Sequence, residues 1–226
     1  LRAVKPMEYV LVVDNRKKIA PIRDRRLRDY NIYVRGGTVD GNGLAGCMTI
    51  YGFMHFTLND MSFLNGRGYG LRVNGGCELI ANNLYFRCLN SGLAGNVALF
   101  ADGCDSHYTD CVVVDYTGGI KTSGHSNRFT RCHVWGGTVP PKGMGLAEWG
   151  FYYGANKRKR AEGKWTKADE SDLLAKGVPE MLENSICFDL GGHMNTLRDS
   201  YADTGAIGFK VGGWGQQIVG CWFLNN

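Results

Sequence analysis

The sequence lacks any run of about 18 consecutive apolar residues, so it contains no candidate transmembrane helix. Proline is scarce, with 5 residues among 226, and the 33 glycines follow no three-residue period, which excludes a collagen-like chain. The 44% of hydrophobic residues is enough to bury a core, which excludes wholesale disorder. Because glycine costs roughly 1 kcal/mol inside a helix relative to alanine, so much glycine favours a turn-rich β protein.

The eight cysteines form no CxxC pair and show no Cys/His spacing typical of zinc sites, so neither a metal nor a cofactor is expected. The chain begins with Leu1 rather than methionine, and residues 221–226 read as a strand with no closing element after it. We therefore expect a segment of a longer protein.

Self-comparison shows a repeat of 21 to 27 residues, with one longer gap of 68. A glycine precedes each repeated segment by seven or eight residues. The repeated segments are Asp60–Phe63, Asn83–Phe86, Asp110–Val113, Arg131–Val134, Asp199–Ala202 and Gly220–Phe223.

Apolar residues keep the same register in every repeat, and alternation along a strand puts them on one face. Two of these columns are Met48, Leu71, Leu99, Ile120, Phe188, Phe209 and Leu58, Ala81, Tyr108, Phe129, Leu197, Ile218. Short strands that repeat in register with glycine corners indicate an all-β fold, a right-handed parallel β-helix. A β-sandwich is the alternative, although its strands need not repeat in register.

Another inward column contains Cys111, Cys132 and Cys221. A thiol there acts as a small buried apolar group, and the stack needs no bridging. We therefore expect free core thiols, which fit synthesis in a reducing cytosol.

The repeat divides the chain into a basic N-terminal segment, residues 1–29, and a β-helix, residues 30–226. The basic charges lack interleaved aromatics, which favours a solvated face over nucleic-acid binding. An insertion at about 139–184 interrupts the repeat, and Gly150–Gly154 within it can be aligned with Gly208–Gly212 as part of a further coil. Thr166–Lys176 reads as a short helix with Thr166 as N-cap.

Residues 31–43 read NIYVRGGTVDGNG, a strand that ends in a tight turn. This opening, followed by stacked coils containing GC and N/D-x-x-F elements, resembles the pectate-lyase-like β-helix superfamily. This superfamily includes polygalacturonase-type hydrolases, polysaccharide lyases and bacteriophage tailspikes, so the resemblance implies a function of one of these kinds. If the chain resembles tailspikes in particular, a homotrimer is also implied. The hydrolase signatures NTD, DD, GHG and RIK are missing, so no catalytic residue is carried over.

Two outward rows precede the glycine corner and mix cations, carboxylates and aromatics. The first is Thr49, Arg72, Phe100, Lys121, Asp189 and Lys210, joined by Tyr152 if the further coil exists; the second is Tyr51, Asn74, Asp102 and Ser123. Such rows suit an acidic polysaccharide, because cations bind carboxylates and rings pack on sugar faces. The expected substrate-binding residues are Arg72, Asn74, Lys121, Tyr152, Lys210 and Trp149.

Glycoside hydrolysis needs two carboxyl groups roughly 5 to 9.5 Å apart. The candidates are Asp102, Asp189 and Glu148, with the first two about 10 Å apart if two coil steps separate them, and about 14 Å apart if a coil is inserted. A lyase would need a base and a group that neutralises the uronate, roles open to Lys121 and Arg72.

A further outward row, Tyr85, His133, Tyr201 and Trp222, suits either sugar binding or a neighbouring subunit. The net charge of +5 favours an anionic glycan. Together these features favour a tailspike-type depolymerase of a bacterial surface polysaccharide, located in a virion tail with other tail proteins as possible partners. The alternatives are a non-catalytic structural or receptor-binding β-helix and, for location, secretion.

Overall fold

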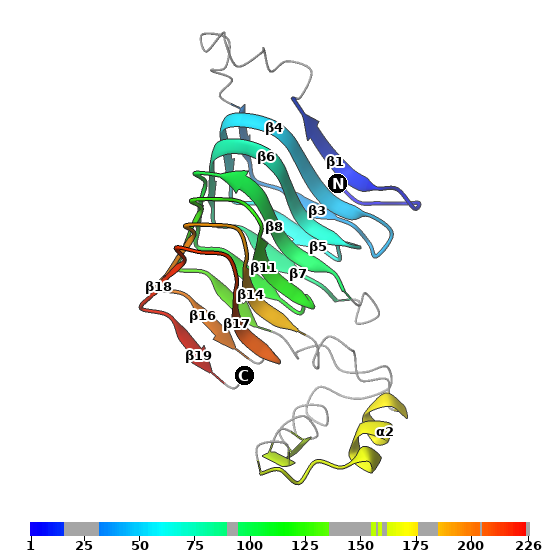
Figure 1. The fold of residues 1–226 in the computed structure, drawn as a ribbon. Coiled ribbons are helices and arrows are strands. Elements are labelled where there is room, and N and C mark those ends of the chain that lie inside the picture. Colours follow the sequence, from blue (N-terminus) through cyan, green and yellow to red (C-terminus); the bar gives the residue numbers. More distant parts are fainter. Residues whose placement is uncertain are drawn as a thin grey trace.

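The computed structural model describes residues 1–15, 32–89, 95–135, 155–156, 158–159, 162–175, 185–203 and 205–224. The strands stack as successive coils, and every strand pairing in the described part of the chain is parallel (Figure 1). The right-handed parallel β-helix is thus confirmed, and the β-sandwich alternative is excluded.

Each coil contributes to three faces, which we call front, side and back. The front face contains β1 (Tyr9–Asp14), the first halves of β4 (Gly46–Asn59) and β6 (Tyr69–Asn82), β8 (Val97–Cys104), β11 (Gly118–Thr122), β14 (Ile186–Leu190) and β17 (Ile207–Val211). The side face contains β2 (Ile32–Arg35), the second halves of β4 and β6, β9 (His107–Thr109), β12 (Arg128–Thr130), β15 (Thr196–Arg198) and β18 (Gln217–Val219). The back face is a separate seven-stranded sheet: β3 (Thr38–Asp40), β5 (Ser62–Leu64), β7 (Tyr85–Arg87), β10 (Val112–Val114), β13 (His133–Trp135), β16 (Tyr201–Asp203) and β19 (Trp222–Leu224).

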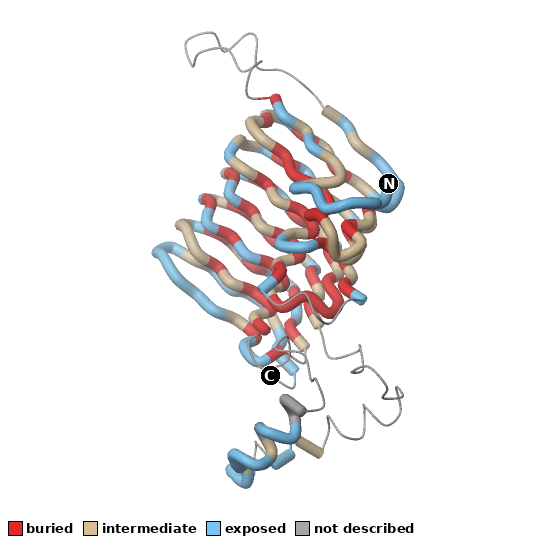
Figure 2. Tube along the Cα trace, turned by 90° about the vertical axis from the view of Figure 1, so that its right-hand side faces the viewer, coloured by how far each residue is buried: buried red, intermediate tan, exposed pale blue. Residues whose placement is uncertain are grey.

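The predicted apolar columns form the core. Ile120, Phe129 and Phe188 are fully buried, and the ring of Phe129 stacks on that of Tyr108 with centroids 4.9 Å apart. Figure 2 shows buried positions recurring from coil to coil. Phe223 occupies an equivalent apolar position in the last described coil, but it is 68% exposed, because among the described residues no further coil packs on it.

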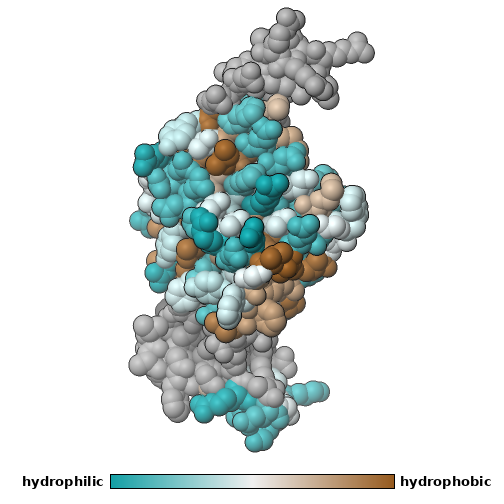
Figure 3. Space-filling view, turned by 90° about the vertical axis from the view of Figure 1, so that its left-hand side faces the viewer, coloured by the Kyte–Doolittle hydropathy of each residue, from teal (hydrophilic) through white to brown (hydrophobic). Residues whose placement is uncertain are grey.

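Seen from the side of the molecule drawn in Figure 3, the surface is mostly hydrophilic, with hydrophobic patches toward the C-terminal coils. No helix among the described residues is long and apolar enough to cross a membrane.

The first residue of each repeated segment has positive φ, as in Asp60 (58°), Asn83 (51°) and Asp110 (55°). Asp and Asn tolerate this left-handed conformation better than most residues. Their backbone N–H groups donate to the next coil, as from Asp60 to the carbonyl of Asn82 at 3.1 Å. These residues therefore form the corner between the side and back faces.

The corner between the front and side faces is packed more tightly. A Cβ at Gly124 would collide with the carbonyl oxygen of Gly103 in the preceding coil, so glycine is required there. Beside this glycine, buried asparagines form hydrogen bonds from coil to coil. The Asn127 side chain accepts a hydrogen bond from the Ser106 N–H at 3.2 Å, and the Asn195 side chain accepts one from the Asn127 N–H at 2.9 Å. Such buried bonds hold adjacent coils in one register.

The insertion adds no coil to the described solenoid. β11 pairs directly with β14, and Lys121 lies opposite Asp189. No further coil is therefore present between these two strands, and residues 150–154, which suggested one by alignment, lie outside the described residues.

The predicted helix is confirmed as α2 (Lys167–Ala175). Thr166 Oγ1 accepts the Asp169 N–H at 3.2 Å, and the Asp169 carboxylate accepts the Thr166 N–H at 3.0 Å, which is a capping box. The Lys159 ammonium and these bonds lower the pKa of Asp169 to about 2. Lys176 lies outside the described residues.

The basic N-terminal segment contributes to the solenoid, since its strand β1 pairs with β4 on the front face. Its clustered basic residues from Arg16 to Arg28 lie outside the described residues.

The cysteines follow the prediction in part. Cys111 and Cys132 are free and buried, and Cys221 is free and half-buried. However, Cys77 and Cys104 form a disulfide between neighbouring coils, so the expectation of unbridged cysteines is wrong for this pair.

Candidate functional site

The first predicted outward row is confirmed on the front face. Consecutive coils place Arg72 opposite Phe100, Phe100 opposite Lys121, Lys121 opposite Asp189, and Asp189 opposite Lys210. Parallel strands lie about 4.8 Å apart, so these side chains form a ladder at that spacing. Thr49 continues the row but is fully buried, so the accessible part begins at Arg72.

Arg72 is held between two aromatic rings. Its guanidinium carbon lies 5.0 Å from the ring centroid of Tyr69 and 5.9 Å from that of Phe100. A hydrogen bond to Tyr9 raises the pKa of Arg72, so the guanidinium is charged and also held in position. Tyr69 was missed in the sequence because it falls outside the repeated outward rows.

Asp189 lies between two lysines. Its Oδ2 is 3.6 Å from Nζ of Lys121 and 3.8 Å from Nζ of Lys210. The Asp189 side chain is 17% exposed, whereas the two lysine side chains are 47% and 59% exposed. Exposed ion pairs contribute little free energy, roughly 0 to 1 kcal/mol, so either ammonium can turn to a ligand carboxylate at small cost.

A cavity of about 140 Å³ opens beside this trio. Its lining includes Lys121, Asp189, Val97, Thr117, Gly118 and Ile186. Thr117 is 8% exposed, and its Oγ1 has no hydrogen-bond partner in the described structure. A Cβ at Gly118 would approach Val97 Cγ2 to 2.9 Å, so glycine leaves the space open. The cavity lining therefore offers one cation, one carboxylate and an unpaired hydroxyl, while the second lysine of the trio, Lys210, lies outside the lining.

The second predicted row lies beside the first, with Asn74 opposite Tyr51 and Asp102 opposite Asn74. Asn74 Nδ2 donates to Thr49 Oγ1 at 2.9 Å, and Ser123 Oγ donates to Asp102 Oδ1 at 2.7 Å. Asn74 is thus bonded to a residue of the first row, and Asp102 to a residue of its own row.

Asp102 and Asp189 are not brought together. Two coil steps separate their strands, which is the spacing expected from the sequence if no coil is inserted. A two-residue offset along the strand raises the separation of their Cα atoms to about 12 Å, whereas the two carboxyl groups of a glycoside hydrolase lie roughly 5 to 9.5 Å apart. Glu148, Trp149 and Tyr152 lie outside the described residues, so their roles remain predictions.

The back face carries the predicted aromatic row, with Val112 between Tyr85 and His133, followed by Tyr201 and Trp222. The rings of His133 and Tyr201 stack with centroids 3.7 Å apart. Burial lowers the pKa of His133, so the neutral imidazole is favoured. This face presents flat rings where the front face presents charges.

No protein family, curated protein or solved structure matches this chain. The fold alone therefore defines its class, a parallel β-helix protein with a charged, cavity-bearing front face and an aromatic back face.

Proposed function

We propose that the protein binds an acidic polysaccharide of a bacterial surface along its front face and cleaves it at the Lys121–Asp189 cavity, as a tailspike-type depolymerase. The observation that carries this proposal is the ladder Arg72, Phe100, Lys121, Asp189, Lys210, which passes a cavity lined by Lys121 and Asp189.

Binding follows from the chemistry of the ladder. Arg72, Lys121 and Lys210 can each donate hydrogen bonds to a carboxylate of an extended chain, and hydrogen bonds to charged groups contribute about 1.5 to 3 kcal/mol each. The Tyr69 and Phe100 rings offer apolar surface to sugar faces.

Elimination fits the described geometry better than hydrolysis, since Asp102 and Asp189 are too far apart to act as an acid and base pair. In a uronate chain, the Asp189 carboxylate would take the C5 proton, and the electron pair of that C–H bond would form the C4–C5 double bond. The bond from C4 to the glycosidic oxygen would break, and that oxygen would take up a proton from solvent. The Lys121 and Lys210 ammoniums would stabilise the charge that develops on the uronate carboxylate.

The test is a release assay with a panel of capsular and O-antigen polysaccharides, in which oligosaccharide products and ultraviolet absorption of unsaturated ends are followed. We expect unsaturated products, and we expect Asp189→Asn to reduce their rate about a hundredfold or more while binding persists. Asp102→Asn is the matched control and should stay near the unaltered rate. Equal loss in both variants, with saturated products, would replace elimination by paired-carboxylate hydrolysis.

A second candidate is a non-catalytic receptor-binding β-helix. It is favoured by the two lysines that hold Asp189 and by the large separation of the two described carboxylates. Binding without products across the whole panel would establish this candidate and reject cleavage.

The proposal includes assembly as a homotrimer in a virion tail, with secretion as the alternative location. Light scattering during size-exclusion chromatography should then give three times the chain mass of 24.9 kDa. A monomer at micromolar concentration would reject the trimer.

A further inference from the structure

The outer edge of the corner between the front and side faces carries an unusual column of side chains. Each residue in it pairs with the equivalent residue of the next coil. In coil order the column is Met54, Cys77, Cys104, His125, His193 and Trp214. Five of these six are sulfur or imidazole side chains, the groups that bind zinc and other soft or borderline metals.

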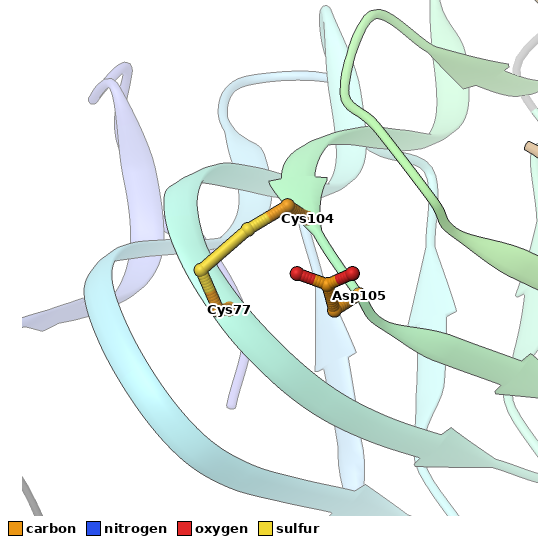
Figure 4. Close-up of side chains that lie close together, drawn as sticks. All are labelled: Cys77, Cys104 and Asp105. Atoms are coloured by element: carbon orange, nitrogen blue, oxygen red, sulfur yellow. A yellow bond between two sulfur atoms is a disulfide. The ribbon is translucent and has the colours of Figure 1, made fainter. Parts of the chain in front are cut away.

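Two members of this column, with one neighbour, lie close enough to share an ion. Cys77 and Cys104 lie on neighbouring strands with Cα atoms 4.7 Å apart, and Asp105 follows Cys104. One ligand atom from each of the three residues lies within 4.8 Å of the others. Figure 4 shows the Asp105 carboxylate beside the disulfide.

The backbone holds Asp105 in place. Its φ of 51° is a conformation that Asp tolerates, and its N–H donates to the carbonyl of His125 at 3.0 Å. Both cysteines are only partly buried and the aspartate is exposed, so solvent reaches the cluster. By contrast, the free thiols of Cys111 and Cys132 are fully buried.

We propose that reduction of the Cys77–Cys104 disulfide turns this corner into a zinc site, with the two thiolates and the Asp105 carboxylate as ligands and a water in the fourth position. Zinc takes four ligands of this kind in tetrahedral geometry. The sequence shows no zinc spacing because the two cysteines come from successive coils, 27 residues apart.

The backbone need not move for the change of state. With zinc–sulfur bonds of about 2.3 Å, tetrahedral ligation places the sulfur atoms about 3.8 Å apart, compatible with two side chains on strands at ordinary spacing. Rotation about the Cα–Cβ bonds suffices to part the sulfur atoms.

The chemistry balances with a phosphine as reductant. The phosphine takes one oxygen atom from water and becomes a phosphine oxide, while the disulfide gains two electrons and two protons and becomes two thiols. Zinc then displaces the two thiol protons. Two thiolates and one carboxylate leave a net charge of −1 on the zinc complex.

The test uses the whole chain, oxidised or reduced with a water-soluble phosphine, and titrated with Co²⁺ as a spectroscopic probe. We expect sulfur-to-cobalt charge-transfer absorption with one ion per reduced chain, and its loss when Zn²⁺ is added. The oxidised chain should show no such absorption. Equal absorption in both states, or none in the reduced chain, would overturn the proposal.

Variants assign the ligands. Cys77→Ser should abolish the charge-transfer band, and Asp105→Asn should weaken Co²⁺ binding by about tenfold or more, as loss of a ligand costs at least as much as loss of an outer-shell partner. Cys221→Ser and Asp110→Asn are matched controls, a half-buried free thiol and another positive-φ aspartate, and both should bind as the unaltered chain does. Asn tolerates positive φ, so Asp105→Asn tests the site even if Cys77→Ser fails to fold. Unchanged binding in Asp105→Asn would overturn the assignment.

Discussion

The front and back faces share the same coils and the same core, yet they carry opposite chemistry. The front row presents the cation of Arg72 and, further along, Asp189 between Lys121 and Lys210, with a cavity lined by Lys121 and Asp189. The back row presents stacked rings, with His133 and Tyr201 in direct contact. A β-helix thus fixes the spacing of outward positions, while the residues that fill each row decide what that face can bind.

The two faces also differ in how firmly their side chains are held. The Lys121 and Lys210 ammoniums are exposed and lie 3.6 and 3.8 Å from their shared carboxylate, so they can reorient toward a ligand. On the back face the His133 ring stacks with the rings of Tyr201 on the next strand and Trp135 on its own strand, with centroids 3.7 and 5.8 Å away. We therefore expect ligand binding to depend on the front face. We expect part of the pH dependence of stability to come from His133 on the back face.

The largest effect should come from the core that both faces share. Phe129→Ala removes a fully buried ring stacked on Tyr108, which should lower the free energy of unfolding by about 3 to 5 kcal/mol. Urea unfolding followed by tryptophan fluorescence measures this loss. Tyr201→Ala, on the exposed back face, is the control. A loss below about 1 kcal/mol for Phe129→Ala would contradict the burial of this column.

The next effect separates the faces by ligand affinity. The double variant Lys121→Ala, Lys210→Ala removes two of the three cations of the ladder and should weaken binding of an acidic polysaccharide at least about tenfold, with a smaller dependence on salt. Isothermal titration calorimetry at two salt concentrations measures both quantities. Tyr201→Ala should change affinity less than about twofold. The reverse ranking would move the binding site to the back face.

Much of the fold could be predicted because a solenoid repeats its register. The columns through Ile120 and Phe129 and the outward row through Lys121 follow from counting residues between glycine corners. The cap of α2 is equally local, since Thr166 and Asp169 are three residues apart. Such features depend on short stretches of chain and on alternation along strands.

The pairing of Cys77 with Cys104 was missed because it depends on a shift of one residue in register. The pairing shifts between Asn74 and Cys77, so the coil steps before and after the corner differ by one residue. Counting from Gly75 and Gly103 therefore places Cys77 beside Asp105, and not opposite Cys104. The separation of Asp102 and Asp189 was underestimated for a related reason, because an offset along the strand adds to the distance across strands.

The smallest effect concerns the back face and pH. Burial lowers the pKa of half-buried His133 below its ordinary value of about 6.5, although the Asp203 carboxylate opposes this. The unfolded chain then binds the proton more readily than the folded chain, so stability is complete above about pH 6.5 and falls as the pH drops toward the lowered pKa. The melting temperature measured between pH 7.5 and pH 5 should fall in the unaltered chain, and less in His133→Phe.

Two variants on the same face make this prediction specific. Tyr201→Phe keeps the ring that stacks on His133 and should keep the full pH dependence, whereas His133→Phe keeps a ring but removes the titrating group. Carboxylates such as Asp110, whose pKa is lowered by the Arg131 guanidinium, lose their contribution only as the pH falls below about 4, so they leave the window of His133 undisturbed. If His133→Phe and Tyr201→Phe show the same fall in melting temperature, His133 is not the group that titrates, and the difference between the faces lies in ligand binding alone.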